Sequence, residues 1–544
     1  MWFLRSLVFV IVFGLIGLPV LVPIANLFTH PHILTHWTFT DRILPLLFNT
    51  CSLILGTVIM AVPIGTLWAI LLFRTNLPLH RVFLSLTLIC LFLPLPLQIT
   101  AWQAALQNNV WPLSTFWQPR PGQPWPQGLF PAIWVHSIVA IPWVTILVGQ
   151  TLHQHNAEWE EESLLLLPAW RVLTTVTLRQ ARPGVVLACL WVTLQVFCDI
   201  SVTDMFLVRT FGEEVYLRFS RGGTNSMAET VAKFTPYSLL FVGMLLYCCW
   251  RMRSQFPVFQ AGQRRTFRFS LGLWRWLWLF IAVLFLWFLF GLPLQSLWWK
   301  SGLSGTPLQW SWSGWWDGLT TTFVLDGATV VSSLLLCLLC GFLAVTLALG
   351  ICWTSHSTRG LRFVYFGLLV IAYSLPSPII GFGLKEVILT LVDWFPQSFL
   401  AKVLYYRPSY VPILWAYLLK TLPLAVAILW PSYQNIPREW LESAQLEGAS
   451  SFRIFRRVQL PLLIVPIVIS ILAVAALALN EVGVSIIAGT PGTETFTLLL
   501  FNRMHYGVSR DVSCLALVLL FVLLTFLAEI GLRFKGRPQE SKLG

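Results

Sequence analysis

Charged residues are scarce in this sequence: 10% of its 544 residues are Asp, Glu, Lys or Arg, whereas 57% are hydrophobic. A soluble domain carries about 25% charged residues, so the composition excludes an ordinary water-soluble protein and indicates lipid as the solvent. A phosphate-binding loop is missing as well, because no G-x-x-x-x-G-K-S/T pattern and no Gly-Lys dipeptide occur anywhere. We therefore expect this chain not to hydrolyse ATP itself.

Metal-ligand patterns are also sparse. The ten cysteines lie mostly inside apolar runs, and the C-x-x-C formed by Cys337 and Cys340 is in mid-span with no second pair. His30, His32 and His36 cluster in the first external loop, but no shell of carboxylates is evident around them, which favours solvated histidines. We expect no metal site and no cofactor bound by this chain.

Long apolar runs dominate what is present. A helix needs about 20 apolar residues to cross a hydrocarbon core of about 30 Å, and its backbone amides must be satisfied internally there. We predict an all-α polytopic membrane protein with about 12 transmembrane helices. The predicted spans lie near 3–27, 45–73, 82–104, 129–151, 183–208, 236–252, 272–296, 322–352, 361–384, 409–430, 463–489 and 513–533.

The formal net charge of +13 reflects topology rather than nucleic-acid binding. With a cytoplasmic N-terminus, roughly 22 of the 35 Lys and Arg residues fall on the cytoplasmic side, as the positive-inside rule requires. The first apolar run follows Arg5 but lacks a clear cleavage site, which favours an uncleaved helix over a signal peptide. We expect a multi-pass protein of the bacterial inner (plasma) membrane with cytoplasmic N- and C-termini, membrane lipid as a partner and no nucleic-acid partner.

Several features recur at one offset of 282 residues, which indicates an internal repeat. The matched pairs are Pro94 and Pro376, Pro96 and Pro378, Glu160 and Glu442, and Asp199 and Glu481. Because six spans separate the copies, both halves start on the same side of the membrane, as parallel repeats with a pathway between them. We predict a first six-helix repeat at 1–255, a basic cytoplasmic linker at 256–271 and a second six-helix repeat at 272–544.

The cytoplasmic segment 437–462 is polar and patterned, and it interrupts an otherwise apolar chain. Residues 438–447 favour a helix whose apolar surface includes Trp440 and Ala444. Gly448 suits the helix end, where a positive φ is needed without a Cβ clash. The segment therefore predicts a short helix, a turn and a second, basic helix that lie across the membrane face.

The spacing of this segment resembles the EAA loop of ABC importer permeases. The residues that carry the resemblance are Glu442, Ser443, Ala444, Gly448, Val458, Leu460 and Pro461. In that family the short helix is the coupling helix, which docks in a groove of a cytoplasmic ATPase. The resemblance implies that Glu442 approaches the ATPase, that Ala444 permits close packing and that Gly448 makes the turn. The alternative is an amphipathic cytoplasmic loop with no partner.

The same resemblance implies the other components of such an importer. Two copies of a cytoplasmic ABC ATPase would bind ATP and Mg, and a periplasmic or lipid-anchored solute-binding protein would deliver the solute. This chain would supply the whole translocation channel as a permease subunit without enzymatic activity of its own.

The first-half counterpart, 155–182, departs from the EAA pattern. Glu160 keeps the Glu position, and Val176 and Leu178 keep the hydrophobic end. The replacements are Glu161 and Glu162 for the small residues, Leu166 for Gly and Arg179 for the final Pro. We expect this loop to dock with a different geometry, so that charge reversal at Glu442 impairs transport more than the same change at Glu160.

Ionisable residues inside apolar runs cost about 2.5–3.5 kcal/mol each on insertion scales, so they usually face a cavity or a partner. The candidates are Asp199, Asp204, Asp326, Lys420 and Glu481. Repeat symmetry could bring Asp199 and Glu481 toward the central axis, where acidic oxygens would suit a hard cation. The alternative, which we favour, places these groups at hydrated helix ends or in ion pairs. The four prolines of the repeat are expected to break helices beside the pathway rather than to bind a solute.

The fused twelve-span form is similar to iron(III) and thiamine importer permeases. After the eleventh span, the stretch GTPGTETFTLLLFNRMHYG resembles the iron(III) branch. We therefore expect iron(III) as the solute, with thiamine, sulfate or molybdate, and polyamines as alternatives.

Two other classes of protein compete with this interpretation. An ion-coupled secondary transporter can also have twelve spans, but it would not need the segment 437–462. A membrane enzyme, such as a lipid-linked glycosyltransferase, would need convergent acid–base or metal groups on one face, and the sequence shows none.

Overall fold

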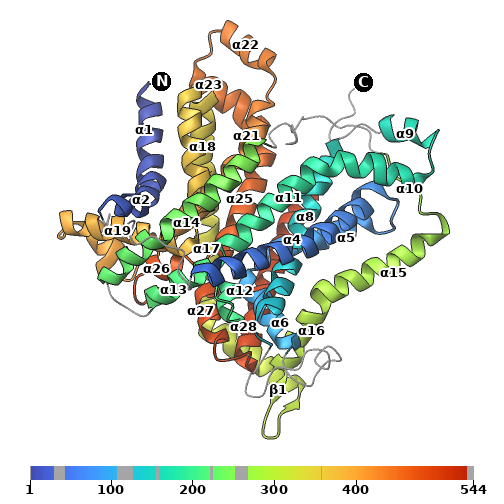
Figure 1. The fold of residues 1–544 in the computed structure, drawn as a ribbon, viewed down its shortest axis with the longest axis horizontal. Helices are drawn as coiled ribbons and strands as arrows, with labels where there is room; N and C mark the ends of the chain where they lie inside the picture. Colours follow the sequence, from blue (N-terminus) through green and yellow to red (C-terminus); the bar gives the residue numbers. More distant parts are fainter. Residues whose placement is uncertain are drawn as a thin grey trace. The chain divides into compact units, whose positions relative to one another are not determined.

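The computed structural model describes residues 2–29, 43–106, 126–154, 158–220, 224–251, 267–356 and 358–535. The first-half elements are α1 (Trp2–Val12), η1 (Phe13–Gly17), α2 (Leu18–Thr29), α4 (Ile43–Arg74), α5 (His80–Leu91), α6 (Leu95–Leu106), α8 (Leu129–Gln154), α9 (Glu158–Leu164), α10 (Ala169–Val172), η2 (Leu173–Thr177), α11 (Leu178–Cys198), α12 (Ser201–Met205), α13 (Phe211–Ser220) and α14 (Thr224–Arg251). The second-half elements are η4 (Gly272–Trp274), α15 (Arg275–Leu286), η5 (Trp287–Gly291), α16 (Leu292–Ser301), β1 (Leu303–Ser304), β2 (Gln309–Trp310), α17 (Trp312–His356), α18 (Arg359–Ser374), α19 (Ser377–Trp394), α20 (Phe399–Ala401), η6 (Lys402–Tyr406), α21 (Val411–Gln434), α22 (Arg438–Leu446), α23 (Ser451–Ile454), η7 (Phe455–Gln459), α24 (Leu460–Leu462), α25 (Ile464–Asn480), α26 (Ser485–Ala488), α27 (Phe496–Met504) and α28 (Arg510–Lys535). Apart from the antiparallel hairpin β1–β2, the described elements are helical, as predicted (Figure 1).

The long apolar runs form the helices that a membrane protein requires. Length and composition qualify seven described helices as membrane spans, or up to ten if each of three bent helix pairs counts as one span. The predicted spans 236–252 and 513–533 lie outside this set and correspond to α14 and α28. The polytopic all-α class is thus confirmed, while the count of twelve stays a prediction.

Some predictions fall on residues outside the described ranges. They concern His30, His32 and His36, the first residues of the loop 155–182 and most of the linker 256–271. The described end of that linker begins at Phe267 and is paired with the end of α4 through a bridge between Phe269 and Thr75.

The 282-residue offset reappears in the backbone geometry. Helices α5 and α6 meet at 104°, and their counterparts α18 and α19 meet at 115°. Of the five described π-helical turns, those that begin at Leu173 and at Phe455 occupy equivalent positions in the two halves. Helices α11 and α25 are each followed by an acidic residue in extended backbone, Asp199 and Glu481. These shared features are what duplication of one unit would produce.

The chain divides into two compact units, and each unit combines segments of both halves. The first unit comprises Met1–Thr75, Gly128–Ser270 and Ser333–Glu494, and the second comprises Asn76–Gln127, Leu271–Ser332 and Thr495–Gly544. Within the first unit α2 packs against α14 and α19, and within the second α16 packs against α28 and α6. The compact units therefore differ from the two sequential repeats, because α2 and α16 each pack on a helix from the other half.

Glycines allow three helices of the first unit to approach closely. Helix α8 packs against both α4 and α11. A Cβ at Gly65 would lie 2.7 Å from the Val144 side chain, and a Cβ at Gly184 would lie 2.3 Å from the Thr151 hydroxyl. These contacts are possible only without a side chain on the glycine, so the ends of α4, α8 and α11 that meet the first loop are held side by side.

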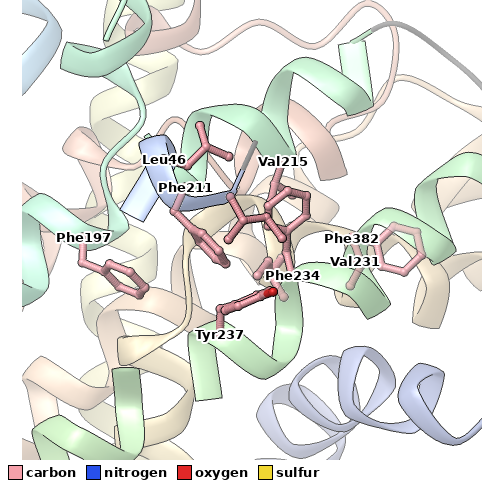
Figure 2. Packing of buried hydrophobic residues seen from close by; sticks show 10 residues of the cluster. Leu46, Phe197, Phe211, Val215, Val231, Phe234, Tyr237 and Phe382 are labelled. Atoms are coloured by element: carbon pink, nitrogen blue, oxygen red, sulfur yellow. The ribbon is translucent and has the colours of Figure 1, made fainter. Parts of the chain in front are cut away.

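A buried aromatic core joins elements of both halves within the first unit (Figure 2). Phe211 of α13 meets Phe234 of α14 edge to face, with ring centroids 5.0 Å apart, and Phe197 follows from the end of α11. Phe382 of α19 contributes the second-half side of the same core. Because lipid is as apolar as these rings, close packing rather than expulsion of water stabilises the contact.

Candidate functional site

The predicted coupling segment folds into a short helix, a turn and a second helix within the first unit. Helix α22 projects past the end of α21 (Figure 1) and ends in a turn at Gly448. The φ of Gly448 is +75°, a left-handed conformation that suits glycine, so the positive φ predicted for this helix end is confirmed. The Ser450 hydroxyl then accepts a hydrogen bond from the Arg453 amide and caps α23.

Helix α22 has no buried residue: Leu441 and Ala444 are partly buried, and its other residues are exposed. Glu442 and Ser443 are exposed, and the side chains of Trp440 and Leu446 are 54% and 89% exposed. The remaining motif residues are Ala444, Val458 and Leu460, which are partly buried, and Pro461, which is exposed. A helix outside the apolar spans that exposes a carboxylate beside large apolar side chains is typical of a surface that a partner covers.

The corresponding first-half helix, α9, presents a different surface. Glu160 is fully buried, whereas Glu161 and Glu162 are exposed. The Arg74 Nη1 donates to Glu160 Oε2 at 2.8 Å, and the Thr177 hydroxyl donates to Glu160 Oε1 at 2.7 Å. Burial raises the pKa of the Glu160 carboxyl, and the attraction of Arg74 and the Thr177 hydrogen bond oppose that rise. Glu160 therefore points into the protein and not toward a partner.

Arg74, which no sequence motif marks, connects four segments of the first unit. Its guanidinium donates to the Leu152 carbonyl at the end of α8 at 2.6 Å and to the Phe267 carbonyl at 3.4 Å. We name this group the Arg74 cluster: Arg74, Glu160, Thr177 and the carbonyls of Leu152 and Phe267. The cluster joins the end of α4, the end of α8, the first loop and the segment that leads into the second half. A lone arginine at the end of a long apolar run was the signal that could have indicated it.

The second half has no arginine at the equivalent position. His356 stands where the repeat offset places Arg74. Its ring lies against Tyr433 with centroids 5.6 Å apart, and the Tyr433 hydroxyl donates to Gln459 Oε1 at 3.1 Å. Glu442, the counterpart of Glu160, lies at the surface. The remaining two candidates of the first loop are both partly buried: Val176 lies in η2, and Leu178 is the first residue of α11.

Asp199 directly follows α11 and lies two residues before the start of α12. Its carboxylate accepts hydrogen bonds from the amides of Ser201 and Val202 at 3.1 and 3.0 Å. The His136 Nε2 of α8 lies 3.6 Å from Asp199 Oδ2. The carboxylate therefore has local backbone partners, as helix N-caps do.

Glu481 occupies the equivalent place after α25, where it accepts from the Val484 amide at 2.9 Å. Lys420 of α21 donates to the Leu375 carbonyl at 2.7 Å and is close enough to Glu481 for electrostatic attraction. Asp199 also lies within electrostatic range of Glu481. The structure thus brings these two acidic residues near one another beside a lysine. We name Asp199, His136, Lys420 and Glu481 the interior charge cluster.

The other pathway candidates have structural roles. Pro94 and Pro96 lie where α5 meets α6, and Pro376 and Pro378 lie where α18 meets α19. Asp326 accepts two hydrogen bonds from Arg503, at 2.6 and 2.9 Å, in the second unit. The prolines therefore coincide with sharp bends, and Asp326 is one side of a bidentate ion pair.

A metal centre is not visible among the residues that the structure describes, because no three or more His, Cys, Asp and Glu side chains are arranged to hold an ion. Cys337 and Cys340 are both buried, and the Cys340 Sγ lies 3.5 Å from the Thr421 hydroxyl. The interior charge cluster is thus a set of backbone-bonded and mutually attracting groups rather than a preformed ligand shell.

Comparisons with known proteins agree with this geometry. Residues 342–534 match the family described as binding-protein-dependent transport system inner membrane component. The chain is similar to the trehalose/maltose transport system permease protein MalF of Thermococcus litoralis, with 28% identity over 162 residues that cover 28% of this chain and 54% of MalF. It is similar to the sulfate transport system permease protein CysT of Salmonella typhimurium, with 27% identity over 273 residues that cover 47% of this chain and 93% of CysT. The spermidine/putrescine transport system permease protein PotC of Escherichia coli is 29% identical over 108 residues, which cover 20% of this chain and 41% of PotC.

The chain spans about half the length of MalF and less than half of PotC. The matched region 342–534 contains the exposed α22, the turn at Gly448 and the bend between α18 and α19. By its description, the matched family belongs to transport systems that depend on a binding protein. Residues 342–534 therefore resemble the inner-membrane components of binding-protein-dependent transport systems, and the similarities to MalF, CysT and PotC are to transport-system permeases as well.

Proposed function

We propose that this chain is the translocation subunit of an ATP-driven importer and that α22 receives the motion of a cytoplasmic ATPase. The exposure of α22 carries the proposal, because the helix presents Glu442 together with Trp440 and Leu446. A groove with a basic group could pair with Glu442 while the apolar side chains leave water. Helix α9, through its exposed residues, makes the second contact.

A continuous path leads from α22 to the interior of the first unit. The segment Ser451–Leu462 continues into Ile464–Asn480 with one bend of 72°. Helix α25 packs against α21, so Glu481 at its end lies near Lys420. Displacement of α22 is therefore passed along α25 to the interior charge cluster. In the first half the corresponding path runs from α9 through α11 to Asp199.

The remaining parts of the importer follow from this arrangement. Two copies of the ATPase would each receive one loop and would hold ATP and Mg themselves. A periplasmic or lipid-anchored binding protein would deliver the solute at the opposite membrane face, with both termini of this chain cytoplasmic. Closure of the ATPase dimer would then rock the helices of the two halves between inward-open and outward-open states.

We propose iron(III) as the solute, on the resemblance of the stretch that follows α25. The described residues offer no metal-binding cluster, so the ion would be selected by the binding protein and only passed along by this chain. Thiamine remains an alternative from the same resemblance. Sulfate, sugars and polyamines are alternatives because they stand in the names of CysT, MalF and PotC.

Reconstitution of the chain with its ATPase and binding protein tests the proposal. We expect ATP hydrolysis to rise when the binding protein is loaded, and Glu442→Lys to abolish this rise. Glu439→Lys, on the same exposed helix but outside the motif, is the matched control and should retain it. Parallel assays with iron(III), thiamine, sulfate, maltose and spermidine identify the solute. Solute uptake driven by an ion gradient with no ATPase present would refute the class.

A further inference from the structure

A groove between α4 and α11 on the first unit has the features of an anionic-lipid site. Its volume is about 660 Å³, and its lining is apolar except for Thr66 of α4 and Arg182 of α11. Leu67 in its wall is 63% exposed although it belongs to a membrane-spanning helix, so the groove opens toward the surrounding lipid.

Backbone geometry explains why the two helices leave space here. Both helices approach α8 closely, through Gly65 and Gly184. Each also carries a proline at the level of the groove, Pro63 in α4 and Pro183 in α11. A proline inside a helix removes one backbone hydrogen bond and bends the axis, which keeps the two helices from packing tightly along their whole length.

The two polar groups of the groove lack partners in the described chain. Arg182 is exposed and has no acidic residue or carbonyl bonded to it among the described residues. The Thr66 side chain is about nine-tenths buried, and its hydroxyl has no hydrogen-bond partner there. Arg182 lies in the first half of the apolar segment 169–198, where its side chain can reach a lipid head group. A buried hydroxyl such as that of Thr66 is costly unless a ligand satisfies it.

We propose that this groove binds one anionic phospholipid, whose phosphate pairs with Arg182 and whose acyl chain lies against Leu67 and Val186. The guanidinium fork matches phosphate oxygens, and basic pockets between membrane helices recognise anionic head groups. The Thr66 hydroxyl donates to an ester or head-group oxygen of the same lipid. The site belongs to the first half alone, because the residue 282 positions after Arg182 is Ile464. The lipid site requires that α4 and α11 lie in the membrane, and it does not depend on the coupling role proposed for α22.

Native mass spectrometry of the detergent-purified full chain, titrated with phosphatidylglycerol or phosphatidylcholine, tests the proposal. We expect the wild type to retain phosphatidylglycerol preferentially, and Arg182→Gln to weaken that retention about fivefold, which is the contribution of one basic residue at about 1 kcal/mol. Arg182→Lys should keep most of the preference. Arg179→Gln removes an equal charge outside the groove and should have no effect.

A second variant separates the acyl-chain contact from the charge. Val186→Trp fills the groove and should lower retention of both lipids without changing the thermal unfolding temperature measured in lipid-free detergent. Equal retention of the two lipids by the wild type would overturn the proposal. Wild-type behaviour of Arg182→Gln, or an equal loss in Arg179→Gln, would overturn it too.

Discussion

Removing the Glu160 charge should destabilise the protein much more than removing the charge of any exposed neighbour. The substitution Glu160→Gln preserves shape but leaves the Arg74 guanidinium buried without a carboxylate. The side chains of Arg74 and Glu160 are 1% and 0% exposed, so water cannot take the place of the missing partner. Glu160→Gln, which replaces one carboxylate oxygen by an amide nitrogen, is therefore a direct test of the Arg74 cluster.

The size of the effect follows from the contacts that remain. Removal of one partner from a buried ion pair costs about 3–5 kcal/mol. Arg74 retains the Leu152 and Phe267 carbonyls, and the new amide oxygen still accepts a hydrogen bond. We therefore expect Glu160→Gln to lower the free energy of unfolding by about 3 kcal/mol, the lower end of this range. The unit that holds the cluster is larger than the domains of 150–250 residues in which 1 kcal/mol shifts the midpoint by about 2–4 °C, so the midpoint of thermal unfolding should fall by only about 4 °C.

A thiol-reactive dye can follow the thermal unfolding, because Cys340 and Cys352 are buried in the same unit. Glu161→Gln, exposed in the same helix, is the control and should change the midpoint by less than about 2 °C. Arg74→Met and Glu160→Met complete a double-mutant cycle. The double variant should be more stable than either single variant, since apolar side chains can replace a buried pair at little cost. A wild-type midpoint for Glu160→Gln, or a double variant less stable than both single variants, would refute the reasoning.

Two further predictions concern glycines. Gly448→Ala places a side chain on a residue with φ of +75°, which costs about 1–2 kcal/mol. We expect this variant to reduce the ATP hydrolysis that the binding protein stimulates. The control Ala449→Gly should leave that hydrolysis unchanged. Gly483→Ala would put a Cβ 2.5 Å from the Ser377 Cβ, so we expect a loss of about 1–3 kcal/mol in the free energy of unfolding and slower uptake into vesicles. Gly360→Ala, with open space around it, is the control for both measurements, and an equal effect there would count against the steric argument.

Much of the fold could be predicted because its causes are local in sequence. A long apolar run must become a helix in lipid, and a proline pair such as Pro376 and Pro378 marks the place where the helix breaks. The positive φ of Gly448 was also predictable, because helices commonly end at a glycine in the left-handed conformation. The repeat offset also suggested that Asp199 and Glu481 approach each other, but the sequence favoured hydrated helix ends or ion pairs for both; in the structure the two carboxylates lie within electrostatic range of each other.

The burial of Glu160 could not be predicted in this way. Its immediate neighbours Glu161 and Glu162 are charged and exposed, which gives the whole segment the pattern of a solvated surface. Its partner Arg74 lies 86 residues earlier in the chain, and only the packing of α4 and α11 on α8 brings the two together. For the same reason the packing of α2 on α19 and of α16 on α6 leaves no signal in local hydropathy.

The equivalent carboxylates of the two loops, Glu160 and Glu442, have different surroundings. The covalent connection between the two halves explains this difference. Glu442 is displayed on α22, whereas Glu160 holds Arg74, which in turn bonds to Phe267 in the segment that leads into the second half. A chain with both halves joined must fix this junction, and a carboxylate committed to it cannot also reach a partner. We infer that the departure of the first loop from the EAA pattern accompanies this structural role. Loss of Glu160 should therefore lower stability and affect coupling only as a consequence, whereas loss of Glu442 should abolish coupling at unchanged thermal stability. Thermal unfolding and stimulated ATP hydrolysis, measured on the same two variants, separate these outcomes.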